Sequence, residues 1–448
     1  MEEETQESQL FDLYLDMLED TENPLIFHRW TLISAIAASM GRNICLPFGV
    51  EGIYPNMYIV LIGASASRKS HSIAIGRKIL RLSGYEKFAS AKSSKEKFME
   101  DLAIGFDNID GDMETKLSEL VSVPPELREP CEVLISAGEL EDFMGRNNGE
   151  FISMLTNLYD PQPSYSIRKL RSASTYVHEP TLNLIGGATN TTFNNTFPPE
   201  IAGQGFLSRL TLVHGKGARK KIAWPSEPDN DIMKFIAATL LKIRKELKGK
   251  FTVDQAAHDA LTEIYVSHRP LDDIRFESYN GRRHIHLLKL CMVYAAADVR
   301  QTITYKDVVN AHTTLVWTEQ GMPAALGEFG KSKNGETLTR IIELCKQRGN
   351  EPIPMKELWV AVAHDFEKKE DLIIAVKKLI EADKLVMVNK DHVMAVDKDV
   401  DRKIVHINFD LLREYTEQEY DRATACANVD GELEASIIKD ECERVLSD

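Results

Sequence analysis

Short apolar runs alternate with amphipathic stretches over the first half of the chain. Four of these runs predict buried strands, at residues 58–63, 131–139, 181–186 and 206–214. Each run is rich in aliphatic or β-branched residues and ends in glycine or polar residues, which is typical of strands buried on both faces. The alternation with helical segments favours an α/β fold, in which a mostly parallel sheet is covered by helices up to about residue 220.

Segments with a helical spacing of apolar residues precede and separate these strands. The expected helices cover residues 10–18, 27–40, 71–82, 93–103 and 151–159. A further strand is expected at 43–47, and a hairpin within 164–177, which is rich in β-branched and basic residues. Residues 108–130 are polar, acidic and proline-containing, so we expect a surface insertion there.

Helical periodicity takes over after residue 230, with helices expected at 232–247, 253–267, 284–299 and 305–321. A small-residue linker at 327–335 then precedes three helices and a short β-pair, which is the order of a winged helix. The pattern therefore divides the chain into an N-terminal helical segment (1–50), a core (51–222), an α-helical lid (223–326), a winged helix (336–398) and a tail (399–448).

The composition predicts a globular protein of the cytoplasm. Hydrophobic residues make up 43% of the 448, and the acidic start Met1-Glu2-Glu3-Glu4 does not resemble a signal peptide. No run approaches the roughly 18 apolar residues that a membrane span needs. The six cysteines are scattered without a C-x-x-C pair, so reduced thiols are expected rather than disulfides or zinc ligands.

The net charge of −15 argues against a generally basic nucleic-acid coat protein. The charge is unevenly distributed, because residues 399–448 hold 14 acidic and 6 basic side chains. A local basic channel in the rest of the chain is compatible with this balance. The acidic tail is expected to be solvated or to bind a partner.

The apolar run 58–62 leads into a loop of small residues that ends in Lys69-Ser70, directly before an expected helix. This order holds the phosphates of a nucleoside triphosphate, because free N–H groups and the helix dipole point at the anion. Lys69 would reach the β- and γ-phosphates of ATP, and Ser70 would ligate Mg²⁺. The expected ATP-binding residues are Gly63, Ala64, Ser65, Ala66, Ser67, Arg68, Lys69 and Ser70.

The loop departs from the G-x-x-x-x-G-K-[ST] pattern at one position, where Arg68 replaces the second glycine. The small residues before Arg68 keep the loop lean enough to surround a phosphate. The alternative is an ordinary strand, turn and helix with a chance Lys-Ser pair. The expected order of strand, loop and helix favours the nucleotide site.

Hydrolysis also needs a carboxylate that orients water, a polar group near the γ-phosphate and a cation for the transition-state charge. Glu139 is the candidate for the water, and Thr189 and Asn190 are candidates for the γ-phosphate. The alternatives are a solvated strand-end glutamate and two turn-forming residues. Gly138 stands where an aspartate commonly supports Mg²⁺, so Ser70, water or a nearby carboxylate would hold the metal.

Three groups of basic residues outside the loop have candidate roles. Arg209 is the candidate for a cation that completes the site of a neighbouring subunit, and a surface ion pair is the alternative. Near the tip of the expected hairpin, Arg168, Lys169 and Arg171 would bind DNA phosphates without reading bases. A solvated basic loop explains these three cations equally well. A second basic run at 216–221 is either another DNA contact or a linker.

Several motifs together resemble a phage and bacterial family of helicase-like P-loop ATPases from the replication genes of mobile elements. They are Phe27-His28-Arg29-Trp30, Tyr54-Pro55-Asn56-Met57-Tyr58, the loop 63–70, Ile135-Ser136-Ala137-Gly138-Glu139-Leu140, Leu158-Tyr159-Asp160 and Gly203-Gln204-Gly205-Phe206-Leu207-Ser208-Arg209. The resemblance covers roughly residues 10–320. That family accepts an arginine before the loop lysine, as at Arg68.

Leu207-Ser208-Arg209 before an apolar strand is also similar to the arginine-finger segment of minichromosome-maintenance (MCM) helicases, which are AAA+ proteins. Arg282-Arg283-His284 resembles the start of their lid, which implies that Arg283 contacts the nucleotide. Gly138 departs from the MCM pattern. The resemblance implies a P-loop AAA+/RecA-like parallel-sheet core, an α-helical lid and a C-terminal winged-helix domain.

These features predict a ring-forming DNA helicase or translocase, a homo-oligomer such as a hexamer, that uses ATP and Mg²⁺ and grips single-stranded DNA. By the resemblance it acts in phage or mobile-element replication, in the cytoplasm of a bacterial host. The alternative is an ATP-switched assembly or loader module that recruits replication or recombination proteins without unwinding DNA, and Gly138 favours it. A small-molecule phosphotransferase is the least favoured reading. Unwinding polarity, ring size, DNA or RNA preference and loading partners are not defined by the sequence.

Overall fold

The chain divides into two units, Met1–Gly327 with Ile404–Asp448, and Glu328–Lys403. The computed structural model describes residues 8–105, 123, 128–167, 175–198, 205–268, 270–271, 273–327, 340–342, 344–345, 348, 351–366, 368–381, 384–389, 392–395, 405–408 and 411. The break after Gly327 falls at the start of the predicted linker.

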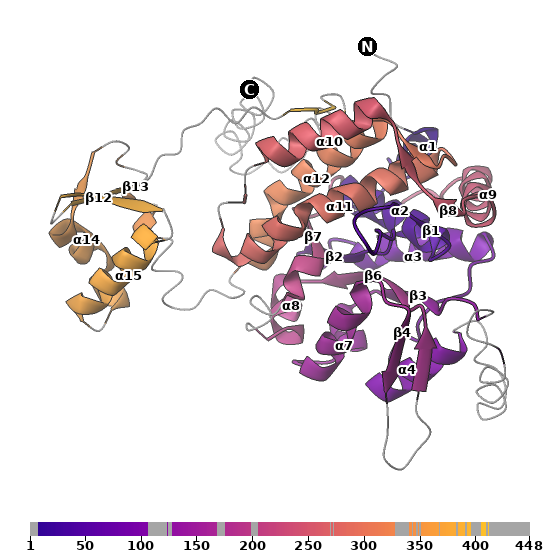
Figure 1. Ribbon diagram of the computed structural model, residues 1–448, viewed down its shortest axis with the longest axis horizontal. Coiled ribbons are helices and arrows are strands. Elements are labelled where there is room, and N and C mark those ends of the chain that lie inside the picture. The colour runs from indigo at the N-terminus through magenta and orange to yellow at the C-terminus, as the bar shows by residue number, and fades with distance from the viewer. Residues whose placement is uncertain are drawn as a thin grey trace. The chain divides into compact units, whose positions relative to one another are not determined.

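A four-stranded parallel sheet lies at the centre of the first unit (Figure 1). Its strands are β2 (Tyr58–Gly63), β3 (Glu132–Ala137), β6 (Thr181–Ala188) and β7 (Leu210–Gly215), in the order β3-β6-β2-β7. The fold class is therefore mixed α/β with a parallel sheet, as predicted. One boundary was misplaced: a 3₁₀ turn, Leu207–Arg209, occupies the predicted start of the fourth strand.

Helices account for most of the other described residues of this unit. They are α1 (Gln9–Met17), α2 (Leu25–Met40), α3 (Lys69–Leu82), α4 (Lys95–Ile104), α6 (Leu140–Met144), α7 (Gly149–Tyr159), α8 (Asn190–Thr196), α9 (Asn230–Glu246), α10 (Gln255–Ser267), α11 (Glu277–Ala297) and α12 (Tyr305–Leu326). A 3₁₀ turn, Ile274–Phe276, precedes α11. Within the described ranges, no helix is both long and apolar enough to cross a lipid bilayer.

Alternate side chains of the sheet enter different parts of the core, as the two-residue period of a strand requires. Ile59 and Leu61 of β2 belong to the hydrophobic cluster that contains the buried residues of α1, α2 and α9. Tyr58 points to the other face, where its hydroxyl donates to Leu155 O of α7 at 3.0 Å. Helices therefore cover both faces, with α2 and α3 on one and α7 and α8 on the other (Figure 1).

The predicted N-terminal segment, core and lid share one hydrophobic core. Buried residues from α1, α2, β2, α9, α11 and α12 form a single cluster. Trp30 of α2 is 1% exposed, and its indole N–H donates to Thr318 Oγ1 of α12 at 2.9 Å. These three predicted parts therefore lie within one compact unit. Helix α11 also begins seven residues before its predicted start at 284.

Short strand pairs lie outside the central sheet. The predicted strand at 43–47 is reduced to β1 (Ile44–Cys45), which pairs with β8 (Gly249–Lys250), and β9 (Thr252–Val253) pairs with β10 (Thr302–Ile303). The predicted hairpin is confirmed: β4 (Ser164–Ile167) is antiparallel to β5 (Thr175–His178).

The second unit has its own small core and an antiparallel sheet. Its described elements are β11 (Ile353–Pro354), α14 (Met355–Val362), a 3₁₀ turn (Ala363–Asp365), α15 (Lys369–Glu381), β12 (Leu385–Asn389) and β13 (His392–Ala395). The strand order is β11-β13-β12, and the core includes Leu358, Leu372 and Val393. The last two predicted helices and the β-pair follow in the predicted order, whereas the first of the three predicted helices falls only partly within the described residues.

Candidate functional site

The loop between β2 and α3 has a constrained backbone. A Cβ atom at Gly63 would lie 2.9 Å from both Gly215 O and Ser67 Oγ, so only glycine fits there. Ala66 and Arg68 adopt positive φ angles of 66° and 61°. Each such non-glycine residue costs about 1–3 kcal/mol, and strained residues of this kind cluster at ligand sites. The shape of this loop is therefore imposed by its surroundings.

The Lys69 ammonium group lies inside this loop. It donates to Gly63 O at 2.9 Å, to Ala64 O at 2.8 Å and to Ser67 Oγ at 3.1 Å, and Lys69 is only 4% exposed. Burial lowers the pKa of Lys69, while the nearby Glu139 carboxylate acts in the opposite direction. A buried cation thus lies at the N-terminus of α3, where the helix dipole also favours an anion.

Ser70 joins the loop to the end of β3. Its hydroxyl donates to Gly138 O at 3.0 Å, although β6 lies between β2 and β3 in the sheet. Gly187 of β6 permits this crossing, since a Cβ there would lie 2.5 Å from Gly138 O. Sequence reasoning missed the role of Gly187; the Gly-Gly pair inside an apolar strand was the available signal.

Glu139 lies beside the loop, as expected for the end of the second predicted strand. Its side chain is exposed and accepts no hydrogen bond from the described residues. Nearby, Glu141 pairs with Arg146 and is thus engaged, whereas Asp142 is exposed. Glu139 is therefore the acidic side chain next to Lys69 that is available to water.

Thr189 and Asn190 lie at the same edge of the sheet, and both have structural partners. Thr189 is the N-cap of α8, where its hydroxyl accepts from Thr192 N at 3.0 Å. The Asn190 amide donates to Ala324 O at 2.9 Å and to Ala325 O at 2.8 Å, which fixes the end of α12. Thr189 therefore has the local structural role that was the alternative to a phosphate contact. Both N–H groups of the Asn190 side chain already donate to carbonyl groups at the end of α12.

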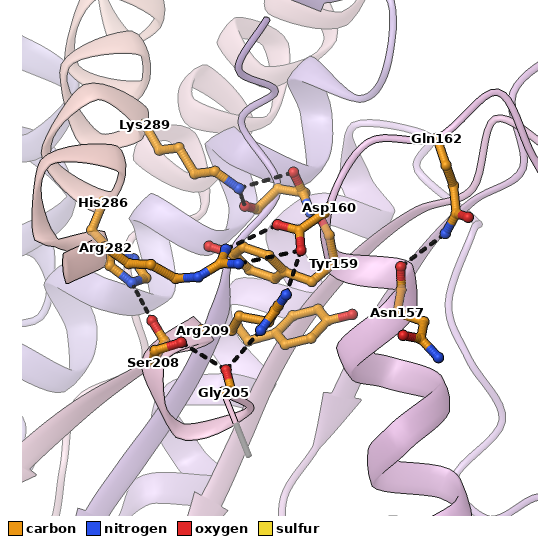
Figure 2. Close-up of polar contacts among 12 residues, drawn as sticks. Asn157, Tyr159, Asp160, Gln162, Gly205, Ser208, Arg209, Arg282, His286 and Lys289 are labelled. Atoms are coloured by element: carbon orange, nitrogen blue, oxygen red, sulfur yellow. Dashed lines mark hydrogen bonds and ion pairs between the residues drawn. The ribbon is translucent and has the colours of Figure 1, made fainter. Parts of the chain in front are cut away.

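A second polar cluster lies where β7 begins (Figure 2). Arg209 pairs with Asp160 and donates to Gly205 O at 2.7 Å, while Arg282 binds the same Asp160 carboxylate at 2.9 Å. Burial alone would raise the pKa of Asp160, but hydrogen bonds from both arginines outweigh it and lower the pKa. Within one chain, Arg209 therefore forms an ion pair, which was the alternative to a role in a neighbouring site.

Arg209 and the loop between β2 and α3 are at opposite ends of the sheet. Leu210 pairs with Tyr58, the first residue of β2, whereas the loop starts after Gly63, the last residue. At about 3.3 Å per residue, the strand separates the two by roughly 17 Å. Arg209 is therefore too far away to assist the loop of its own chain.

A cavity of about 570 Å³ lies beside the second cluster and is lined by Lys289, Arg282 and Tyr159 among others. Lys289 donates to Asn56 O at 2.6 Å and to Asn56 Oδ1 at 3.1 Å, and its ammonium lies 4.1 Å from the centroid of the Tyr159 ring. Burial lowers the pKa of Lys289 to about 7. Sequence reasoning missed Lys289; a lysine inside an apolar helical stretch was its signal.

Arg283 is not positioned as the resemblance implied. It is 3% exposed, and its guanidinium binds Glu319 Oε1 at 2.7 Å and Oε2 at 3.0 Å. Tyr279 also donates to Glu319, at 2.8 Å. The expected nucleotide contact is therefore corrected: Arg283 belongs to a buried ion pair, and the adjacent Arg282 lines the cavity.

The remaining predicted residues divide into two groups. Arg168, Lys169 and Arg171 lie outside the described residues, between β4 and β5. In the basic run 216–221, Lys220 contacts Glu19 at 3.5 Å and Asp20 at 3.4 Å. Lys220 of this run therefore contacts the turn after α1.

A scan against protein-family models finds no match for this chain, and a search of curated proteins finds no match either.

Proposed function

We propose that this protein is an ATPase that assembles into a ring and moves along DNA. The observation that carries the proposal is the hydrogen bond between Ser70 and Gly138. It brings the loop after β2 and the acidic end of β3 together at one edge of a parallel sheet. Ligands of open α/β sheets bind at this carboxyl edge of the strands.

The residues of the loop fit a triphosphate and Mg²⁺. Gly63 has no room for a Cβ, the backbone at Ala66 and Arg68 is strained, and the Lys69 ammonium lies inside the loop. Lys69 and the amides at the start of α3 would hold the phosphates, and the Ser70 hydroxyl would ligate the metal. Bound Mg²⁺ would neutralise charge on the phosphate oxygens.

Glu139 would orient the attacking water and accept its proton. Its exposed carboxylate lies near Lys69, so a water held by Glu139 is close to the end of the loop where the terminal phosphate belongs. Proton transfer to a positioned carboxylate contributes typically 10²- to 10⁴-fold to a reaction rate. Ser70 and Lys69 would bind while Glu139 performs the proton transfer.

Arg209 would act on the nucleotide of a neighbouring subunit. The distance along β2 excludes a role in its own chain, and Arg282 is held beside it by the same carboxylate. Head-to-tail contact between copies would bring this edge against the loop edge of the next copy, and such an interface generates a ring. Asp160 would keep both guanidinium groups oriented toward that interface.

The DNA would be held by the β4–β5 hairpin segment. Arg168, Lys169 and Arg171 would contact phosphates of a single strand, and ATP-dependent closing of the interface would move the hairpins. The resemblance to helicase-like P-loop ATPases and MCM proteins supports an AAA+/RecA-like core, a role in phage or mobile-element replication and a bacterial cytoplasmic location. It also supports a winged helix for the second unit.

An ATP-switched module that recruits other proteins is the second candidate. The second unit exposes several apolar side chains, among them Ile374 at 53%, Val360 at 73% and Val388 at 50%. Exposed apolar side chains do not contact phosphates, so they support a protein partner rather than DNA for this unit. The lack of a carboxylate at Gly138 also favours binding over turnover.

Phosphate release from ATP, measured with Mg²⁺ and with or without forked DNA, tests the proposal. We expect hydrolysis that DNA stimulates, strand displacement on the fork, and loss of both in Lys69→Ala. Hydrolysis without DNA stimulation or strand displacement would favour the switch. Absence of nucleotide binding by the wild-type protein would overturn both candidates.

A further inference from the structure

The turn between α1 and α2 lies against the phosphate loop. Asn23 is 1% exposed, and its amide donates to Arg68 O at 2.9 Å and to Ser72 Oγ at 2.6 Å. The Asn23 Oδ1 atom also lies 3.3 Å from His71 Nδ1. One buried side chain thus contacts the N-cap residue of α3 and two residues of its first turn.

Glu22, the preceding residue, binds the side chain of Arg68. Its Oε2 atom accepts from Arg68 Nε at 2.9 Å and lies 2.7 Å from Nη2, while Oε1 accepts from Ile222 N at 3.2 Å. The hydrogen bond from Arg68 lowers the pKa of Glu22 and so favours its charged form. Arg68 is therefore held at both its main chain and its guanidinium.

Arg68 needs such support because of its backbone. Its φ of 61° and ψ of 21° are in the left-handed region, which a glycine adopts without strain and an arginine does not. Its carbonyl oxygen accepts from His71 N at 3.0 Å and from Ser72 N at 3.2 Å, as an N-cap residue requires. This orientation leaves the first N–H groups of α3 directed out of the helix, where an anion binds.

We infer that Asn23 and Glu22 form a clamp that holds Arg68 in the left-handed conformation, and that Asn23 is a positioning residue for the loop. The clamp stabilises a left-handed backbone conformation at position 68 that a glycine would adopt without support. Without it, Arg68 relaxes and the N–H groups at the start of α3 turn away from the ligand. The consequence for nucleotide rests on the proposed function, whereas the clamp itself does not.

A double-mutant comparison tests the clamp. Wild type, Asn23→Ala, Arg68→Gly and the double variant are compared by amide hydrogen exchange of residues 64–70 without nucleotide, and by binding of a fluorescent ATP analogue with Mg²⁺. We expect Asn23→Ala to raise exchange and weaken binding by about tenfold each, the effect of a lost buried hydrogen bond. Arg68→Gly in the same chain should restore both to within about threefold of wild type, because glycine tolerates the conformation.

Matched controls separate positioning from general destabilisation. Asn310 is a buried asparagine of the same unit, bonded to Asn408 Nδ2 at 2.8 Å, so Asn310→Ala should lower the melting temperature without raising exchange in the loop. If Asn23→Ala folds poorly, Glu22→Ala, which removes the less buried half of the clamp, should raise loop exchange two- to threefold. The inference is overturned if the loop exchanges equally fast in Asn23→Ala and in the double variant. It is also overturned if neither Asn23→Ala nor Glu22→Ala exchanges faster than wild type. A wild type that binds no analogue but shows the rescue in exchange overturns the ATPase instead.

Discussion

The Ser70 hydroxyl donates to Gly138 O across the end of β6, 3.0 Å away. A Cβ atom at Gly138 would lie 3.4 Å from Ser70 Cβ and 3.5 Å from Ser70 Oγ, which is ordinary contact. Gly138 is also absent from the residues with positive φ. A side chain at this position therefore fits without strain and points at the proposed metal ligand.

Gly138→Asp should strengthen Mg²⁺ binding. The new carboxylate would lie next to Ser70 Oγ and add a charged oxygen ligand, which Mg²⁺ prefers. We expect the Mg²⁺ concentration for half-maximal ATP hydrolysis to fall by about tenfold, a change of about 1.4 kcal/mol. A magnesium titration of phosphate release measures it.

Gly138→Asn and Gly138→Ala serve as controls for size. Both should leave the Mg²⁺ requirement within about twofold of wild type, because neither adds a charge. An unchanged requirement in Gly138→Asp, with normal folding by circular dichroism, would show that residue 138 does not face the metal.

Lys69→Ala and Glu139→Gln should separate binding from turnover. The Lys69 ammonium lies inside the loop, so its removal should weaken ATP binding at least tenfold. Glu139→Gln should leave binding within about threefold and reduce turnover by roughly 10²- to 10⁴-fold, because the amide cannot accept the proton. Calorimetric binding and phosphate release measure the two effects. Weak binding in Glu139→Gln would contradict the proposed role.

Arg209→Ala should abolish turnover without weakening ATP binding. A transition-state arginine is worth about 10³- to 10⁵-fold, and Arg209 lies at the far end of the sheet from its own loop. Mixing Arg209→Ala with Lys69→Ala should restore activity, because about a quarter of randomly assorted head-to-tail interfaces combine an intact loop with an intact arginine.

The mixed sample has two controls. Each variant mixed with itself should stay inactive, and Lys245→Ala, which removes an exposed lysine of α9, should behave as wild type. Full activity of Arg209→Ala alone would show that Arg209 is not part of the nucleotide site. A mixture that assembles to the same oligomer as wild type but stays inactive would show the same.

The central sheet was predictable because its strands are buried on both faces. Runs such as 58–63 are continuously apolar and end at glycine, so periodicity and length identify them. The start of β7 was misplaced because Phe206 and Leu207 are apolar for a different reason. Both are 1% exposed and fill the core from a 3₁₀ turn and the residue before it. Apolar content alone does not distinguish these two cases.

The order of strand, loop and helix around residues 63–70 was predictable because these residues are contiguous. The residues that support the loop from elsewhere in the chain were not predictable. Asn23 is 45 residues from Arg68 in the sequence. Asn23 and the preceding Glu22 lie in a turn of ordinary polar composition. Arg282 and Arg283 are adjacent, and only the packing of α11 decides that one lines the cavity while the other meets Glu319. Contacts between distant residues leave no periodic signal in one sequence.

Arg283 should prove structural. Arg283→Ala leaves the Glu319 carboxylate buried without its cation, so we expect a loss of about 3–5 kcal/mol in the free energy of unfolding. Replacing both residues by Met and Leu should recover most of this loss, because the buried charge is gone. Urea denaturation measures it. The ATP affinity of the folded Arg283→Ala protein should equal that of wild type. A loss of ATP affinity without a loss of stability would instead support the original prediction that Arg283 contacts the nucleotide.

Lys289 should make the stability of the protein depend on pH. Burial lowers its pKa from 10.5 to about 7 in the folded state, so between these values the unfolded chain binds more protons than the folded one. Stability must then rise with pH across this window, by at most about 1.4 kcal/mol per pH unit from this group. Below pH 7 the full cost of the buried cation is present and its contribution no longer changes.

Lys289→Met isolates this contribution. The nearby groups Asp160, Arg209 and Arg282 are common to both proteins, so their effects largely cancel in the difference between wild type and variant. We expect the stability advantage of Lys289→Met to be greatest at pH 6–7 and to shrink by about 1–1.4 kcal/mol per pH unit toward pH 9.5. Urea denaturation at four pH values measures it. A difference that stays constant from pH 6 to 9.5 would mean that Lys289 keeps its ordinary pKa and is reached by water.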